Sequence, residues 1–202
     1  MHKALRAYVT AKNGTGQFTD LELDLPMPQD ALEAELMALD TGHTICVEAL
    51  DLCGREYLAG LIPKDADLSE LNLLAEKLAS LEPVQEAALE GLVRMDLNKG
   101  MTELPLCRLI DLANSADCCH VAPGIGNDEQ LGHFYVDNDF PVIPPGLPTE
   151  LYEILDYEVI GRKARMEEGG VFTSAGYVVQ HTDLDVSYSQ SLCDPQMEVM
   201  ST

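Results

Sequence analysis

Two long stretches of this sequence contain no lysine or arginine, and the acidic residues within them alternate with apolar ones. The first stretch lies between Lys12 and Arg55, and the second lies between Arg108 and Arg162. In the first, DLELDL (20–25) alternates acids with leucines, which is the period of a strand with one buried face. These acids are therefore expected on folded surfaces, so the chain is constrained to a folded structure with a strongly acidic exterior.

The remaining patterns predict an α+β fold made of short strands and helices. Strands are predicted at 5–9, 20–25, 44–50 and 118–122, with a hairpin over 169–179. Helices are predicted at 30–39, 69–81, 84–95, 106–114, 128–136 and 147–170. Turns are expected at AKNGTG (11–16) and PGIGND (123–128), and PVIPPGLP (141–148) is expected to be a connection.

A linker-like stretch at 63–67 and the start of a further segment near Leu104 divide the chain. We expect an N-terminal α+β domain over 1–64, a central and mainly helical domain over 65–103, and a C-terminal α+β domain over 104–180. The polar end, 181–202, is expected to be a loose tail.

Helix-start signals are present at three points. Asp30 with Glu33, and Asp67 with Glu70, have the spacing of a capping box. Pro83 is suited to the first position of a helix. The helix that follows Asp67 has leucines at helical spacing, which indicates a buried face; they are Leu71, Leu74, Leu78 and Leu81. The next helix has acids at four-residue steps on one face, which we expect to be exposed; they are Glu82, Glu86 and Glu90.

The net charge is far larger than solubility requires. The chain has 35 acidic and 12 basic residues, a net charge of −23, whereas a magnitude of about 2 to 8 keeps a small domain soluble. Self-repulsion at this charge opposes compactness, so it indicates a functional benefit or an extreme environment such as high salt. A fixed array of carboxylates resembles a nucleic-acid backbone, and this charge corresponds to roughly 39 Å of duplex. Such a surface should repel DNA and attract proteins that bind DNA.

Patterns for metal or nucleotide binding are incomplete. Asp137 and Asp139 have the alternation of a calcium loop, but Pro141 stands where a further ligand is required. The adjacent residues 118–120 (CCH) lack the spacing of a zinc site. The segment GIGNDEQLG (124–132) lacks the third glycine of a nucleotide fingerprint at the right position. We therefore predict no metal and no cofactor.

Enzymatic activity is not predicted either, since no signature such as a GxSxG elbow is present. A thiol-dependent or metal-dependent enzyme stays an alternative, because catalytic groups assemble in space rather than in sequence. The sequence has no apolar run of about 18 residues and no secretory signal, so we expect a cytoplasmic protein that does not contact membranes. Its cysteines are then expected to be reduced.

Two parts of the chain resemble ArdA-type antirestriction proteins. LNLLAEKLASL (71–81) resembles that family's central helix, "LNYLAEKL". DCCHVAPGIGNDEQLGHFYVDN (117–138), followed by LYEILDYEVIGRKARMEEGGVFTSAGYV (151–178), resembles its C-terminal part, where "YIDYEAYGRD" leads to "NEGG.FT..GYV". The matching residues are Leu71, Asn72, Leu74, Ala75, Glu76, Lys77, Leu78, Leu155, Asp156, Tyr157, Glu158, Gly161, Arg162, Glu168, Gly169, Gly170, Phe172, Thr173, Gly176, Tyr177 and Val178.

This resemblance, which covers about 67–179, implies an elongated chain of three small α/β or α+β domains that forms a homodimer through its C-terminal domain. It implies that the acidic surface mimics bent B-form DNA and occupies the DNA groove of type I restriction-modification enzymes, with no catalysis and no direct binding of nucleic acid. Such proteins are commonly carried on mobile genetic elements. The alternative is an acidic binding module of the same fold that regulates another basic DNA-binding protein.

The candidate partner-binding carboxylates are the acids that these patterns direct outward. They are Asp20, Glu22, Asp24, Glu33, Glu35, Glu82, Glu86, Glu90, Asp128, Glu129, Asp137, Asp139, Glu150, Glu153 and Asp156. The helix predicted over 147–170 has an apolar stripe of Leu151, Ile154, Leu155 and Val159. Glu158 falls within this stripe, so we expect either that the helix ends before Glu158 or that Glu158 is partly buried beside Arg162.

Overall fold

The chain divides into two compact units, each of which is described by itself. The computed structural model describes residues 3–12, 18–38, 44–101, 104–140, 146 and 148–193. Unit 1 comprises Met1–Glu82, Gly100–Ser115 and Leu184–Thr202, and unit 2 comprises Pro83–Lys99 and Ala116–Asp183. Each unit contains a small three-stranded antiparallel sheet together with helices, so the predicted α+β class is confirmed.

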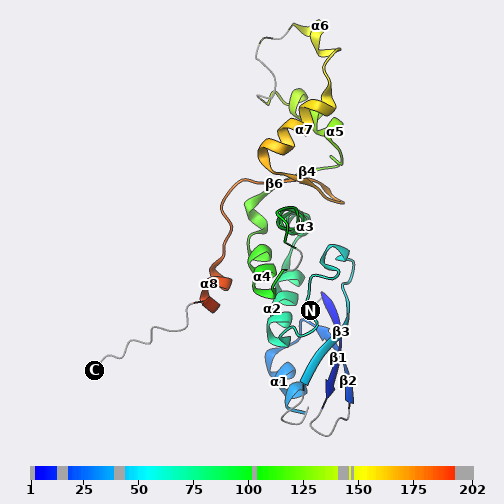
Figure 1. Cartoon of the computed structure of the whole chain (residues 1–202), viewed down its shortest axis with the longest axis vertical. Coiled ribbons are helices and arrows are strands. Elements are labelled where there is room, and N and C mark those ends of the chain that lie inside the picture. The colour runs from blue at the N-terminus through cyan, green and yellow to red at the C-terminus, as the bar shows by residue number, and fades with distance from the viewer. Residues whose placement is uncertain are drawn as a thin grey trace, which may run out of the picture. The chain divides into compact units, whose positions relative to one another are not determined.

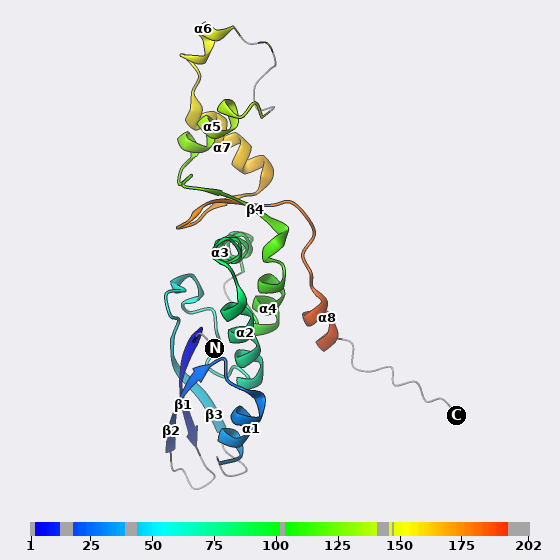
Figure 2. The same ribbon diagram turned by 180° about the vertical axis from the view of Figure 1, so that it is seen from behind.

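The sheet of unit 1 has the strand order β2-β1-β3, with β1 at Leu5–Lys12, β2 at Phe18–Leu25 and β3 at Thr44–Asp51. Figures 1 and 2 show the three strands together. The alternation predicted for β2 is confirmed, because Leu23 and Leu25 are buried while the acids between the leucines are exposed. This register places Asp24 opposite Arg6 of β1.

The helices of unit 1 are α1 (Gln29–Ala38), the 3-10 turn η1 (Glu56–Leu58), α2 (Leu68–Ser80), α4 (Leu106–Asn114) and α8 (Ser187–Cys193). Helices α2 and α4 lie side by side in both ribbon views (Figures 1 and 2). The predicted apolar face of α2 is confirmed, since Leu71, Leu74 and Leu78 are almost fully buried.

The predicted helix starts have mixed outcomes. Asp67 does cap α2, because its carboxylate accepts hydrogen bonds from the backbone N–H groups of Ser69 and Glu70, both at 2.9 Å. The capping box at Asp30 was wrong: the carbonyl of Pro28 accepts the first bonds of α1, which puts Asp30 inside the first turn. The ring of Pro28 fixes a φ that is compatible with a helix, so the helix can begin directly after it. The prediction instead placed the start at Asp30 because an acid followed by Glu33 is a common capping pattern.

The chain end predicted to be loose contains a helix that packs on α4. The carboxylate of Asp111, which is fully buried on α4, accepts hydrogen bonds from the backbone N–H groups of Tyr188 (3.1 Å) and Ser189 (3.3 Å) at the start of α8. The Tyr188 hydroxyl donates to Glu70 at 3.2 Å. The prediction missed this because an acid 77 residues earlier in the chain supplies the cap.

Unit 2 contains α3 (Pro83–Asn98), the 3-10 turn η2 (Ala116–Cys118), β4 (Cys119–Pro123), α5 (Asp128–Asp137), α6 (Thr149–Tyr152), α7 (Tyr157–Glu168), β5 (Val171–Phe172) and β6 (Gly176–Gln180). Its sheet has the order β4-β6-β5. Pro83 begins α3 and the 169–179 hairpin is present, both as predicted. The core includes Ile125, Leu131, Tyr135, Ala164 and Tyr177.

Helices α5 and α7 cross at two glycines, which lets their backbones approach closely (Figure 1). A Cβ added to Gly132 would overlap the carbonyl of Tyr157, and a Cβ on Gly161 would overlap the carbonyl of Asp128. Nearby, the rings of His133 and Tyr157 stack with centroids 3.7 Å apart. The crossing therefore fixes the start of α5 against α7.

The single helix predicted over 147–170 was wrong, because it is divided into α6 and α7. Asp156 starts the second helix by accepting a hydrogen bond from the backbone N–H of Val159 at 3.1 Å. Because of this break, residues 151–159 do not share one helical face, so the predicted apolar stripe does not form. Three of its members, Leu151, Ile154 and Val159, are exposed, and Ile154 is 75% exposed.

Several predictions fall outside the described residues. The turn at 11–16 and the connection at 141–148 lie largely outside them, as does the end of the tail beyond 193. Among the helices that the structure describes, none has both the length and the apolar character needed to cross a membrane.

Candidate acidic interaction surface

The three predicted acids of β2 are exposed, but two of them are paired with bases. Arg6 donates from Nε to Asp24 Oδ1 at 2.7 Å, and its Nη1 lies 2.5 Å from Glu22 Oε1. Lys3 Nζ lies 3.0 Å from Asp24 Oδ1. The hydrogen bonds from Arg6 and then Lys3 hold the pKa of Asp24 below its usual range. We call Glu22 and Asp24 the strand acids.

The geometry of β2 gives a regular row of carboxylates. Alternate residues of a strand are about 6.7 Å apart, which is twice the 3.4 Å axial step between phosphates of one DNA strand. Asp20, at one end of this row, accepts a hydrogen bond from the Thr10 hydroxyl at 3.0 Å rather than from a base. The spacing therefore matches every second phosphate of one DNA strand, whereas much of the charge is neutralised by Arg6 and Lys3.

On α1, Glu33 and Glu35 are both exposed. Glu33 accepts a hydrogen bond from Gln29 Nε2 at 3.1 Å. Residues two apart on a helix face different directions, so these two acids do not form one row.

The expected exposed face of α3 is only partly present. Glu82, which precedes the helix in unit 1, is exposed, and Glu86 is half-buried. Glu90 is 6% exposed, so the prediction that it faces outward was wrong. Glu90 does lie on the predicted helix, but the turn between β5 and β6 covers its side chain.

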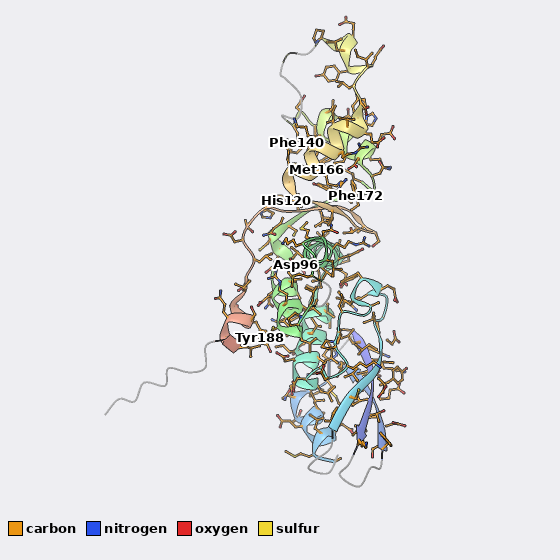
Figure 3. The ribbon with its side chains drawn as sticks, viewed as in Figure 1. Asp96, His120, Phe140, Met166, Phe172 and Tyr188 are labelled. Atoms are coloured by element: carbon orange, nitrogen blue, oxygen red, sulfur yellow. The ribbon has the colours of Figure 1, made fainter. Side chains whose placement is uncertain are left out.

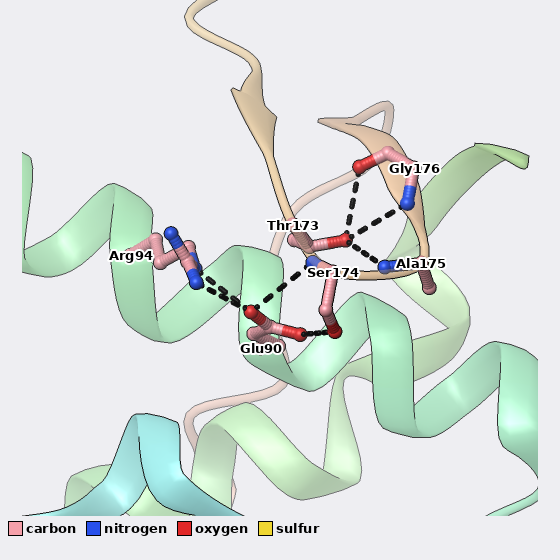
Figure 4. Close-up of polar contacts among 6 residues, drawn as sticks. All are labelled: Glu90, Arg94, Thr173, Ser174, Ala175 and Gly176. Atoms are coloured by element: carbon pink, nitrogen blue, oxygen red, sulfur yellow. Dashed lines mark hydrogen bonds and ion pairs between the residues drawn. The ribbon is translucent and has the colours of Figure 1, made fainter. Parts of the chain in front are cut away.

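Glu90 joins α3 to the β5–β6 turn (Figure 4). Its Oε1 accepts from Arg94 Nε at 3.0 Å and Nη2 at 2.6 Å, and its Oε2 accepts from the Ser174 hydroxyl at 2.9 Å. The Thr173 hydroxyl in the same turn donates to the carbonyl of Gly176 at 2.9 Å. The carboxylate of Glu90 thus accepts hydrogen bonds from Ser174, which lies 84 residues later in the sequence.

Asp128 is also occupied within the fold. Its carboxylate accepts from Arg165 Nε at 2.7 Å and Nη2 at 3.1 Å, and its side chain is 15% exposed. The hydrogen bonds from Arg165 lower the pKa of Asp128, although burial opposes them. The prediction that Asp128 is an outward carboxylate was therefore wrong, because α7 supplies its partner. We call Glu90, Asp111 and Asp128 the core acids.

A third set of acids in unit 2 is exposed and pairs with no base among the described residues. It comprises Glu129 in the first turn of α5, Asp137 and Asp139 at its end, and Glu150 and Glu153 at α6; we call these five the outward acids. Asp139 has a φ of 56°, in the left-handed region. Asp156 is exposed as well, but it caps α7.

Glu158 belongs to α7, so the helix does not end before it. Its side chain is 60% exposed and forms an ion pair with Arg162, one turn later. The expected position beside Arg162 is therefore confirmed, but the expected burial was wrong, because the exposure of Val159 shows that this side of α7 faces solvent.

Three of the cysteines, Cys46, Cys107 and Cys119, are partly buried, whereas Cys53 is exposed. Burial raises the pKa of the Cys119 thiol to about 12 and also raises the pKa values of Cys46 and Cys107. Thiols with raised pKa values are poor nucleophiles at neutral pH. Within the described part of the chain, no group of three His, Cys, Asp or Glu side chains has a metal-binding arrangement.

No protein-family model matches the sequence, and no curated protein matches it either. The arrangement itself is informative. The fold leaves Glu129, at the start of α5, and Asp137 and Asp139, at its end, exposed, whereas it turns Glu90 and Asp128 inward. Sequence reasoning missed Asp111, although its position between Ile110 and Leu112 in an apolar run is a signal of burial.

Proposed function

We propose that this protein is a DNA mimic of the ArdA type, which occupies the DNA groove of type I restriction-modification enzymes and inhibits them. The main support is the set of outward acids, which lie on α5 and α6 or directly after them and pair with no base among the residues that the structure describes. Carboxylates of this kind are available to the lysines and arginines that ordinarily contact phosphates. We propose a non-catalytic role in the cytoplasm.

Residues that carry the resemblance have demanding positions in the fold. Gly161 lies at the α5–α7 crossing, and Gly169 ends α7 with a φ of 70°. A Cβ on Gly170 would overlap the Tyr177 ring, and Tyr177 is itself in the matching motif. These requirements explain the motif in terms of folding, and they support a shared C-terminal architecture.

The proposal includes the elongated three-domain organisation and a homodimer formed through the C-terminal domain. Three apolar side chains of unit 2 support an interface there, because Leu151, Ile154 and Val159 are 38%, 75% and 53% exposed. Large apolar side chains exposed within one short segment can form the contiguous patches that mark protein interaction sites.

A displacement experiment tests the function. A type I methyltransferase core is bound to a fluorescently labelled target duplex at low salt, and the purified protein is added while anisotropy is followed. We expect the duplex to be released, and we expect release to weaken steeply as salt increases, because carboxylates replace phosphates opposite basic side chains. Retention of the duplex at every protein excess would exclude inhibition of this enzyme class.

The alternative partner gives a different result. If the protein instead regulates another basic DNA-binding protein, the duplex stays bound to the methyltransferase, while a nucleoid protein or recombinase is retained on the immobilised protein in a salt-sensitive manner.

A further inference from the structure

Unit 2 contains a cavity of about 660 Å³ that the acidic surface does not use. It is lined by residues of β4, of β6 with the residue that follows, of the second half of α5 with the segment that follows, and by the last residue of α7. Figure 3 labels His120 and Phe140, two of the lining residues. Cavities of roughly 300 to 1,000 Å³ with mainly apolar walls and a few polar groups are typical of small-molecule sites.

Aromatic rings form one wall of this cavity. The rings of Tyr135 and Phe140 meet edge to face with centroids 4.8 Å apart, and Phe134 lies 5.8 Å from Phe140. Phe140 is 44% exposed although it is a large apolar side chain. The face of an aromatic ring attracts a cation placed within about 6 Å of its centroid, so this wall favours positively charged ligands over anions.

A carboxylate stands beside these rings. Glu168 lines the cavity, and its Oε2 accepts hydrogen bonds from the hydroxyls of Tyr135 at 2.6 Å and Tyr177 at 2.9 Å. Burial, together with the hydrogen bond to Glu168, raises the pKa values of both tyrosines, so both hydroxyls stay protonated and keep donating. Two donors on one oxygen fix the carboxylate, and Oε1 accepts no hydrogen bond within the described residues.

The charge of Glu168 has no basic partner in the described part of the chain. Arg165, one turn earlier on α7, is held by Asp128, and Lys163 pairs with Glu167 at 3.8 Å. The two histidines of the lining, His120 and His181, stack on each other with centroids 4.0 Å apart and form no ion pair with Glu168. An unpaired carboxylate therefore borders an aromatic, apolar cavity.

We propose that this cavity binds an organic cation, meaning an ammonium or guanidinium group on an apolar body. The cationic group would lie at Glu168 and the apolar body against the rings of Phe134, Tyr135 and Phe140. The cation has two sources, a free small molecule or the arginine or lysine side chain of a protein partner. This site is independent of the proposed function, because none of its residues is an outward acid.

The experiment is a nuclear magnetic resonance titration of the full chain at physiological salt, in which the methyl groups of Val121 and Val179 report on the cavity. The probes are benzamidine, its uncharged analogue benzamide, and N-acetyl-arginine amide, which represents a protein side chain. We expect saturable shifts with benzamidine and at least about tenfold weaker binding of benzamide, because a charge-assisted hydrogen bond is lost.

Two neighbouring substitutions sharpen the test. Glu168→Gln should weaken benzamidine binding about tenfold, whereas Glu167→Gln, which changes the same charge outside the cavity, should leave it within about twofold. Should Glu168→Gln fail to fold, Phe140→Ala removes an exposed ring and should weaken binding severalfold.

The proposal is overturned if neither cation gives a saturable shift, if benzamide binds as tightly as benzamidine, or if Glu168→Gln, or Phe140→Ala in its place, binds like the unchanged protein. Binding of benzamidine alone supports a free aromatic cation as the ligand. Binding of the arginine derivative with similar affinity supports a protein side chain.

Discussion

The core acids and the outward acids of this protein have the same charge but opposite surroundings. Asp128 and Glu129 are adjacent in sequence, yet Asp128 is held by Arg165 while Glu129 is exposed and pairs with no base among the described residues. Glu90 is 6% exposed; it accepts two hydrogen bonds from Arg94 on the same helix and two from Ser174, and the latter pair joins α3 to a turn. A high density of acid in the sequence therefore does not measure the acid that a partner can reach.

The strand acids are intermediate between these two sets. Glu22 and Asp24 are exposed, and the next base after them in the sequence is Arg55. The pairing of β1 with β2 nevertheless brings Arg6 beside both acids. Strand pairing thus neutralises charge that a linear reading of the sequence leaves uncompensated.

The largest effect on folding is expected from Glu90→Ala. The change leaves Arg94 and the Ser174 hydroxyl without their partner, so it should lower the free energy of unfolding by about 2 kcal/mol. This loss is smaller than the loss on breaking a fully buried ion pair, because Arg94 is half-exposed. Urea denaturation followed by circular dichroism measures this. The matched variant Glu129→Ala should change stability by less than about 0.5 kcal/mol, and equal losses would remove the distinction between the two sets.

Asp111→Ala tests the core acid of unit 1. Loss of the carboxylate leaves the first N–H groups of α8 without a cap, which should cost about 1.5 kcal/mol. Hydrogen exchange should show faster opening of the amides of Tyr188 and Ser189. Asp183→Ala, at an exposed position just before α8, is the control and should leave both amides unchanged; unchanged protection in Asp111→Ala would contradict the assignment.

The fold was predictable where the determining contacts are local. Alternation identified β2, and the spacing of Leu71, Leu74 and Leu78 identified α2 with its cap at Asp67. These patterns depend on residues within a few positions of one another.

The site was less predictable because its surroundings are distant in sequence. Glu90 is covered by Ser174, Asp128 by Arg165, and Asp111 by the start of α8, at separations of 84, 37 and 77 residues. The helical wheel for 147–170 also assumed one continuous helix, and the break before α7 made the predicted directions of its side chains invalid.

Asp128→Asn should have a pH-dependent effect of about 1 kcal/mol. Because Arg165 lowers the pKa of Asp128 in the folded state, its stabilisation is fully present above the unfolded pKa of about 3.9 and is lost as pH falls through the lower, folded value. The difference in unfolding free energy between the two proteins should be constant above about pH 5 and shrink below about pH 4. A difference that grew on acidification would reverse the assigned sign.

The smallest effect is expected from a single outward acid. Glu153→Gln should change stability by less than about 0.5 kcal/mol and weaken binding to a basic partner by no more than about threefold, because an exposed charge contributes little. Displacement of labelled duplex measures the affinity. Loss of all inhibition from this one change would argue for a specific contact and against a distributed mimic.

The most direct test of the mimic compares two block variants in the duplex-displacement assay. One neutralises the five outward acids with Gln or Asn. The other replaces Lys3, Arg6, Glu22 and Asp24 with Gln or Asn, which removes two charges of each sign from the paired strand face. We predict that the outward block requires about 50-fold more protein to displace the duplex, while the strand block stays within about threefold of the unchanged protein. Equal displacement by the outward block and the unchanged protein would contradict the proposal that these acids replace phosphates.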